Sequence, residues 1–317
     1  MMSCCPRALC AVSLAGLLAV ASYTIANHAL AQDKGAEPAP LPKELRLSGI
    51  PDADKDKLAK QFGPVCDYLS KELGIKVSYE HVTDYNAAVV SLAANRIDIS
   101  WLGGVTAVQA EERTKGQAVF VACRDTDLEF KSYFVANKDA IAAGRVKKVE
   151  KLEELKAMLA KCSFTFGDKS STSGHIMPRH FLSLAGIDPE QDISGGPKFQ
   201  LQGGHSATLK AVSSGQVDVG VLNYTNWDKA DDATKQAAPI IYTTPPYVDY
   251  CMVVHKRLGN ELTDKLRTAF TKLDAANPEH AKVLEAFSAK KFVAADPAKW
   301  DGIREILRLL KERKVLD

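Results

Sequence analysis

Four short segments of this 317-residue chain carry glycine, hydroxyl and aromatic side chains that could hold a ligand. They are residues 83–85, 103–106, 170–174 and 203–206, and each stands where a helix is expected to begin. A helix N-terminus offers free backbone N–H groups and a partial positive charge, which suit an anion or an oxygen-rich neutral molecule. Taken alone, each segment is more typical of an ordinary N-cap or turn. Their joint placement after successive strands favours one shared ligand site.

The sequence lacks the local motifs that would indicate catalysis or a metal site. It contains no G-x-S-x-G elbow and no H-E-x-x-H pair. Residues 167–174 look like a phosphate-binding loop but lack the final Gly-Lys-Ser/Thr of a Walker motif. His175 and His180 are five residues apart, so they would not share a helix face as a metal pair does. We therefore predict a binding protein with no resident cofactor. An enzyme with a cysteine nucleophile would need a nearby base, and none is visible.

Alternating strand and helix patterns must position these segments. Residues 45–122 alternate strands with helices, and a similar run extends from 152 to 221, which predicts parallel α/β sheets. One extended segment, 131–136, lies between the two runs, and another, 247–255, follows the second run. This order indicates a lobe inserted into another lobe, with two hinge strands joining them. We expect the first lobe over residues 42–131 and 250–317, and the second over 132–249.

An internal similarity supports two related lobes. Residues 85–99 align without a gap with residues 205–219, and each stretch reads as a helix, a turn and a strand. The alignment places Tyr85 and His205 at matching positions in the first turns of two helices that face each other. The alternative is a chance resemblance, because similar helix–strand units recur in many α/β folds.

The N-terminus has the features of a secretory signal peptide. Arg7 precedes an apolar run over residues 8–26, and Ala29-Leu30-Ala31 provides a small-residue cleavage site. A membrane-anchoring helix is the alternative, but three hydroxyl residues dilute the run. We expect a signal peptide over 1–31, a flexible leader over 32–41 and a protein released into the periplasm.

Charge and cysteine content narrow the possible partners. Without Arg7, 40 Lys and Arg side chains remain against 39 Asp and Glu. This balance argues against a nucleic-acid or anionic-membrane surface, so attraction of a charged ligand must be local. The four cysteines beyond the leader match no zinc or C-x-x-C spacing and could form one of three full pairings or stay free. They are Cys66, Cys123, Cys162 and Cys251.

Residues 83–85, 97–104, 166–174 and 205–212 together resemble the phosphate/phosphite/phosphonate-binding family of periplasmic solute-binding proteins. The resemblance covers nearly the whole chain after the leader. It implies the class II fold, in which two α/β lobes close by hinge motion around one ligand. It also implies a set of cleft-lining residues, with Asp249 as a weaker candidate. The implied ligand-binding residues are Tyr85, Trp101, Gly103, Ser171, Thr172, Ser173 and His205.

Cys123 is a feature that an ordinary oxyanion receptor does not need. It follows the buried strand 119–122, at a place where the cleft rim is expected. Sulfur is the preferred ligand of As(III), and Arg124 could favour the thiolate. The pattern therefore resembles arsenite-binding sensors of this family, with Cys123 as the arsenic ligand and a membrane sensor histidine kinase as partner. The alternative is a receptor that delivers phosphonate, phosphite or selenate-like oxyanions to an ABC permease. Cys123 would then be a buried strand residue or half of a disulfide.

Overall fold

The computed structural model describes residues 42–313 and 315. The predicted signal peptide and leader lie outside the described residues. Within the described part, no helix combines the length and apolar character needed to cross a membrane.

The first sheet has six strands in the order β11-β4-β10-β3-β1-β2. Its bounds are Glu44–Gly49 (β1), Lys76–Tyr79 (β2), Ile99–Leu102 (β3), Ala118–Arg124 (β4), Cys251–His255 (β10) and Phe292–Ala294 (β11). β1 pairs in parallel with β2 and β3, whereas β10 runs antiparallel to β3 and β4, and β11 antiparallel to β4. The sheet is therefore mixed and not purely parallel, because β10 enters it from the opposite direction after the chain has built the second sheet.

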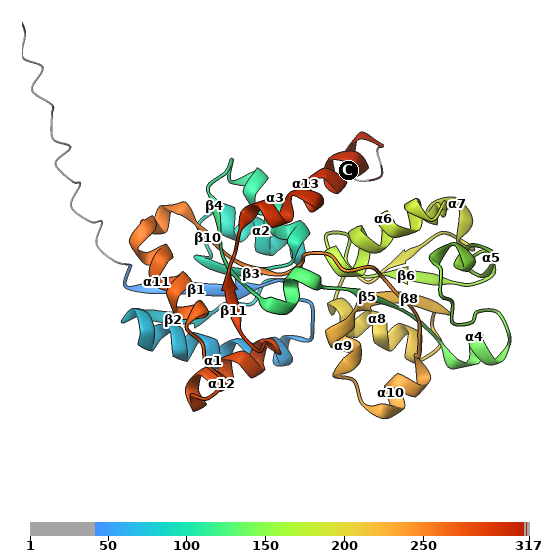
Figure 1. Ribbon diagram of the computed structural model, residues 1–317, viewed down its shortest axis with the longest axis horizontal. Helices are drawn as coiled ribbons and strands as arrows, with labels where there is room; N and C mark the ends of the chain where they lie inside the picture. Colours follow the sequence, from blue (N-terminus) through green and yellow to red (C-terminus); the bar gives the residue numbers. More distant parts are fainter. Residues whose placement is uncertain (1–41, 314, 316–317) are drawn as a thin grey trace, which may run out of the picture. The chain divides into compact units, whose positions relative to one another are not determined.

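Six helices cover this sheet. They are Lys55–Leu73 (α1), Tyr85–Ala93 (α2), Gly104–Arg113 (α3), Gly259–Thr271 (α11), Pro278–Phe287 (α12) and Asp301–Glu312 (α13). α1 packs against α12, while α3 packs against α2 and α13, and these two groups lie on opposite sides of the sheet (Figure 1). In α1 the apolar side chains Leu58, Phe62, Val65 and Leu69 recur at helical spacing and are fully buried, so packing fixes this helix. Gly74 ends α1 in the left-handed conformation that glycine adopts without steric cost.

The second sheet has five strands in the order β7-β6-β8-β5-β9. Its bounds are Ser132–Ala136 (β5), Phe164–Phe166 (β6), Lys198–Phe199 (β7), Val219–Asn223 (β8) and Ile240–Thr243 (β9). Short helices surround it: Lys138–Ala142 (α4), Lys156–Leu159 (α5), Met177–Leu184 (α6), Pro189–Asp192 (α7), Gly204–Ser213 (α8), Tyr224–Asp228 (α9) and Asp232–Ala237 (α10). A π-helical turn, Thr172–Ile176 (η3), precedes α6, and further single turns are Asp125–Glu129 (η1), Leu152–Leu155 (η2), Lys256–Leu258 (η4) and Pro297–Trp300 (η5).

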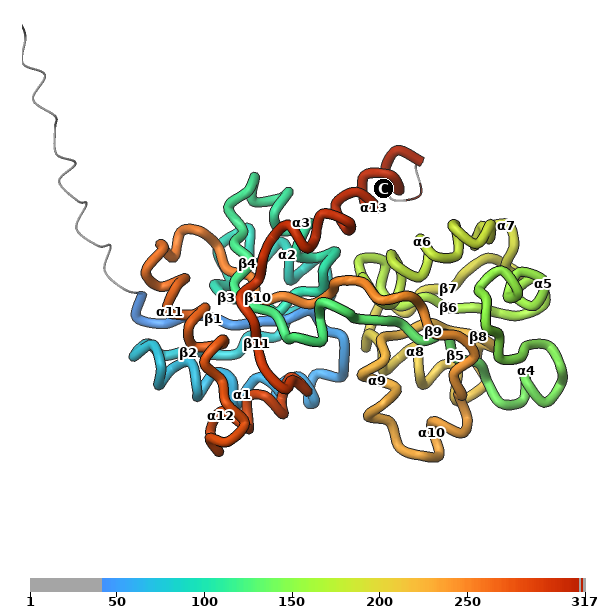
Figure 2. Tube along the Cα trace, viewed as in Figure 1, coloured from blue at the N-terminus to red at the C-terminus, as the bar shows by residue number. Residues whose placement is uncertain are grey.

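The chain passes between the two sheets twice, at residues 125–131 and 244–250 (Figure 2). These crossings are hydrogen-bonded to each other, because Phe130 and Tyr247 exchange backbone N–H···O bonds of 2.7 and 2.8 Å. Asp249 N also donates to the Asp127 carbonyl at 2.9 Å. The two lobes of the fold are thus joined by a paired, two-stranded connection. All strands of the first sheet lie outside residues 132–249, and all strands of the second lie inside that range.

Candidate functional site

Residues 171–173 form the centre of a buried polar cluster between the lobes. They follow β6 and begin the turn η3, with Ser171 as N-cap accepting a 2.9 Å hydrogen bond from Gly174 N. Thr172 Oγ1 accepts a 2.9 Å bond from Val105 N, which belongs to the other lobe. All three side chains of Ser171, Thr172 and Ser173 are buried. The predicted serine and threonine ligands are therefore held together at a helix start that faces the first lobe.

The N-terminus of α3 meets this cluster from the first lobe. Gly104 N donates a 2.9 Å hydrogen bond to Asp249 Oδ1. A Cβ atom on Gly103 would lie 3.1 Å from Thr172 Oγ1 and 3.2 Å from Asp249 Oδ1, so glycine permits this close approach. The N–H groups of Gly104 and Val105, which lack intrahelical partners, thus donate to polar side chains from the crossing strand and from the opposite lobe.

His205 occupies the first turn of α8 and is also buried in the cluster. Asn223 N donates to His205 Nδ1 at 3.3 Å, so the ring proton resides on Nε2, which lies 3.4 Å from Ser173 Oγ. Burial lowers the pKa of His205 to about 3, so the imidazole is neutral at physiological pH. The backbone N of His205 donates across the lobes to the Asp52 carbonyl at 3.1 Å.

Two buried polar atoms at this cluster, Tyr85 Oη and Asp249 Oδ2, have no hydrogen-bond partner among the residues that the structure describes. Burial raises the pKa of Tyr85 well above its ordinary value, and the carboxylates of Asp52, Asp168 and Asp249 add to the effect. Burial, opposed by the hydrogen bond from Gly104, raises the pKa of Asp249 to about 7. A buried polar atom without a partner costs roughly 1–3 kcal/mol. A ligand that offers hydrogen-bonding oxygens would remove that cost.

A hydrogen-bond network behind the cluster fixes the loop that carries it. His175 Nδ1 lies 2.7 Å from the Lys169 carbonyl, and Arg179 Nε donates to His175 Nε2 at 2.8 Å. The same guanidinium forms two bonds to Glu190, of 2.8 and 2.7 Å. Because Arg179 donates to Nε2, the His175 proton sits on Nδ1 and closes the 169–175 loop. Sequence reasoning considered His175 only as a metal ligand and missed this supporting role.

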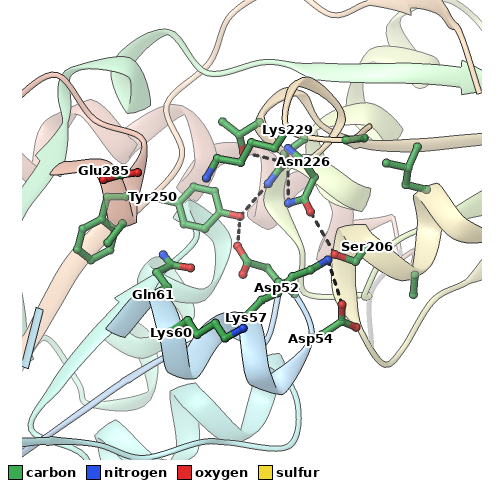
Figure 3. Close-up of a pocket in the computed structure, with 18 of the residues that line it drawn as sticks. Asp52, Asp54, Lys57, Lys60, Gln61, Ser206, Asn226, Lys229, Tyr250 and Glu285 are labelled. Carbon is green, nitrogen blue, oxygen red and sulfur yellow. Dashed lines mark hydrogen bonds and ion pairs between the residues drawn. The ribbon is translucent and has the colours of Figure 1, made fainter. Parts of the chain in front are cut away.

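Trp101 does not belong to this cluster and instead lines a separate cavity of about 1040 Å³. Its ring stacks on Tyr250 with centroids 5.4 Å apart, and the Arg124 guanidinium lies 5.2 Å from the Trp101 ring centroid. Of the eight predicted ligand residues, Trp101 alone lines this cavity, which we call the lysine pocket (Figure 3). Trp101 is thus part of the lysine pocket. The structure brings together the remaining candidates of the cluster, which are Tyr85, Gly103, Ser171, Thr172, Ser173 and His205.

Three residues that sequence reasoning did not single out connect the cluster to the lysine pocket. Tyr250 Oη donates to Asp52 Oδ2 at 2.7 Å, and Asn223 Nδ2 donates to Tyr250 Oη at 3.2 Å. Asn223 in turn donates its backbone N–H to His205. Asp52 lies just beyond β1 and Asn223 ends β8, so the rule that ligands bind beyond strand ends could have flagged both.

The structure places Cys123 in the core of the first sheet and not at the cleft rim. Its side chain is fully buried in β4. Burial is the main cause that raises the pKa of the thiol to about 12, and the negative charge of Asp127 adds to it. Arg124 does lower the pKa of this thiol, as expected, but burial and the charge of Asp127, with which the guanidinium is paired, outweigh its effect. Cys123 therefore loses the exposure and ionisation on which its predicted role as an arsenic ligand rested.

The remaining cysteines share this environment. In the part of the chain that the structure describes, Cys66, Cys123, Cys162 and Cys251 are all unbridged and buried. The same part contains no group of three His, Cys, Asp or Glu side chains arranged as a metal site.

Similarity to known proteins now identifies the class and the family. The aliphatic sulphonate binding protein SsuA of Escherichia coli superposes with a TM-score of 0.60 at 12% identity, covering 87% of this chain and 89% of that one. The two-lobed fold with its buried interlobe cluster is thus that of a periplasmic binding protein. Residues 47–300 match the family "ABC transporter, phosphonate, periplasmic substrate-binding protein". The chain belongs to this phosphonate-binding family of periplasmic substrate-binding proteins. It is a periplasmic binding protein and not an enzyme.

Individual relatives agree with this assignment. The chain is 36% identical over 278 residues to the probable ABC transporter phosphite binding protein PhnD1 of Prochlorococcus marinus, covering 86% of this chain and 91% of the relative. It is 28% identical over 275 residues to the phosphonates-binding periplasmic protein of Escherichia coli, covering 85% and 77%. The structure of PhnD1 in complex with methylphosphonate superposes with a TM-score of 0.79 at 35% identity, covering 85% of this chain and 99% of that one.

Proposed function

We propose that this chain binds a small oxyanion of the phosphonate or phosphite class in the interlobe cluster and delivers it to an ABC permease. The observation that carries the proposal is the pair of buried, unpartnered atoms, Tyr85 Oη and Asp249 Oδ2, beside residues 171–173. The similarity to a phosphite-binding relative supports the same ligand class. The proposed ligand residues are Tyr85, Gly103, Ser171, Thr172, Ser173, His205 and Asp249.

The chemistry of the cluster suits an anion that is held by hydrogen bonds without a counter-ion. The proposed ligand residues include no lysine or arginine, and His205 is neutral. Binding therefore depends on hydroxyl donors and on the partial positive charge at the starts of α3 and η3, where backbone N–H groups have no intrahelical partner. A rigid, dry arrangement of such donors discriminates ligands by the number and geometry of their oxygens.

Export and delivery complete the proposal. Cleavage of the predicted signal peptide after residue 31 releases the protein into the periplasm. Ligand-driven closure of the lobes about the paired crossings at 125–131 and 244–250 then forms the surface that the permease recognises. Closure is favoured only if the ligand binds the closed form more tightly than the open one.

Ligand-dependent thermal stabilisation tests the ligand class. At a concentration of about 100 times Kd, a bound ligand raises the free energy of unfolding by about 2.7 kcal/mol, which corresponds to an increase in Tm of roughly 5 °C or more. We expect this increase with methylphosphonate or phosphite, measured by differential scanning fluorimetry, with sulfate as the control anion. Absence of any shift with phosphonate, phosphite, phosphate or selenate would contradict the proposal.

Arsenite sensing through Cys123 and a histidine kinase remains a separate prediction, and the burial of the thiol argues against it. The same assay separates the two functions when arsenite is added to the wild type and to Cys123→Ser. We expect arsenite to give no shift in either protein and phosphonate to stabilise both equally. Arsenite stabilisation that depends on Cys123 would instead favour the sensor.

Replacing Tyr85 with phenylalanine separates ligand binding from folding. Because Tyr85 Oη has no partner, its removal is expected to leave the free energy of unfolding unchanged or to increase it by up to about 1 kcal/mol. The same change should weaken phosphonate binding about tenfold, since one hydrogen bond to the ligand is lost.

Tyr68→Phe is the matched control for this substitution. Tyr68 is also buried, but its hydroxyl donates to the Ala269 carbonyl at 2.6 Å, far from the cluster. Loss of that bond should lower the free energy of unfolding by about 1 kcal/mol and leave Kd unchanged. Urea titration and calorimetry measure the two quantities. If Tyr85→Phe destabilised the protein like the control and left Kd unchanged, Tyr85 would be a structural residue.

A further inference from the structure

The lysine pocket lies beside the proposed ligand cluster but is separate from it. Its lining residues include Asp52, Tyr250 and Asn223, whose side chains are linked by hydrogen bonds. Figure 3 shows Asp52 beside Tyr250. Beyond these linked side chains lies His205, which contacts both Asn223 and Asp52. None of residues 171–173 lines the pocket. The pocket, at about 1040 Å³, is also much larger than a phosphonate needs.

Basic side chains from both lobes surround this pocket. Lys57 and Lys60 come from α1 and Lys282 from α12, whereas Lys210 comes from α8 and Lys229 follows α9. Arg124 also lines the pocket, but its charge is compensated by the buried carboxylate of Asp127, so five lysines stand against four acidic lining residues.

Of the four acidic lining residues, one is paired with a lysine and two others accept hydrogen bonds from neutral groups. Asp54 pairs with Lys57, Asp231 caps α10 and Asp52 accepts the Tyr250 hydroxyl. In contrast, four of the lining lysines form no ion pair within the described residues: Lys60, Lys210, Lys229 and Lys282. Desolvation and then the charge of Arg124 lower the pKa of Lys229, as expected for an ammonium group held near another cation.

We propose that the lysine pocket is an electrostatic capture site, which attracts the anionic ligand to the mouth of the cleft before it passes to the interlobe cluster. A concave site focuses the field of its uncompensated charges, here those of the four lysines without an ion pair in the described part of the chain, and so raises the association rate constant for an oppositely charged ligand. The interlobe cluster has no lysine or arginine. The positive charges of the lysine pocket would supply the electrostatic attraction that the cluster lacks. This inference rests on the proposed function, because it requires an anionic ligand.

Stopped-flow fluorescence of phosphite and methylphosphonate binding tests the capture site, with Trp101, which lines the pocket, as a reporter. In the triple variant Lys60→Gln, Lys229→Gln, Lys282→Gln, the association rate constant at about 10 mM salt should fall roughly three- to tenfold. The dissociation rate constant should change little. Near 0.5 M salt, where charges are screened, the variant and the wild type should converge.

The control removes the same charge elsewhere, in Lys138→Gln, Lys147→Gln, Lys148→Gln, three exposed lysines that do not line the pocket. Its association rate constant should stay within twofold of the wild type, and melting temperatures verify that both variants fold. Equal loss in both variants, or an association rate independent of salt in the wild type, would overturn the capture site. Failure of the wild type to bind either ligand at equilibrium would refute the proposed function instead.

Discussion

Gly204→Ala is expected to weaken phosphonate binding by roughly 5- to 150-fold, because it prevents the lobes from meeting. A Cβ atom at Gly204 would lie 2.5 Å from the Cα and carbonyl carbon of Asp52 in the other lobe. Backbone atoms cannot yield as a flexible side chain can, so the lobes must separate. Overpacking of this kind costs about 1–3 kcal/mol, which gives the stated range in Kd. The separation also breaks the bond from His205 N to the Asp52 carbonyl.

Gly203→Ala is the matched control, because it shares the backbone strain but not the contact between lobes. Gly203 and Gly204 both have positive φ, at 74° and 51°, so alanine costs roughly 1–2 kcal/mol of stability at either position. A Cβ at Gly203 would approach only Ala207 of its own helix, at 3.2 Å. Calorimetric titration of both variants should show a large loss of affinity for Gly204→Ala alone. Similar affinities would mean that the lobes do not approach this closely when the ligand is bound.

Asp249→Asn is expected to remove most of the pH dependence of ligand affinity above neutrality. The pKa of Asp249, about 7, lies above its ordinary value of 3.8, so the folded protein holds a proton that the unfolded chain releases. The stability that this proton confers is fully present below pH about 3.8 and is lost as the pH rises through about 7. Above pH 7 the ionised carboxylate also repels an anionic ligand, and affinity should fall by up to about tenfold per pH unit.

The ratio of wild-type to variant Kd isolates this effect, because the ionisation of the ligand cancels. The groups that face Asp249 include Gly104 N–H and the buried carboxylate of Asp127, and both are retained in the variant. His205 does not titrate in this range, since its pKa is about 3. Asp168, with a pKa raised to about 6 by burial, is the control position. Asp168→Asn should change the pH dependence of Kd only below pH 7. Parallel profiles for wild type and Asp249→Asn would show that Asp249 does not contact the ligand.

Much of the fold follows from local sequence patterns. Within the run 45–122, predicted to alternate strands with helices, α1 and α2 form because their apolar side chains recur at the helical period, and Gly74 ends α1. Extended segments were predicted at 131–136 and 247–255, and most of these residues form β5 and β10. The observed crossings at 125–131 and 244–250 begin earlier in the chain and pair through Phe130 and Tyr247. Strand direction was less predictable, since β10 inserts antiparallel between β3 and β4 only after the second sheet is complete.

The sequence by itself determined which segments begin helices and carry hydroxyl and glycine residues, because capping and turn chemistry are local properties. It therefore located segments 83–85, 170–174 and 203–206, in which the family resemblance implied Tyr85, residues 171–173 and His205 as ligand-binding residues. Only the tertiary structure decided which side chains meet across the lobes and which are buried, because these depend on contacts between residues far apart in the chain. Thr172 meets Val105 and Asp249 meets Gly104 for this reason. The same packing encloses Cys123 in the core, although its position at a strand end pointed to the cleft.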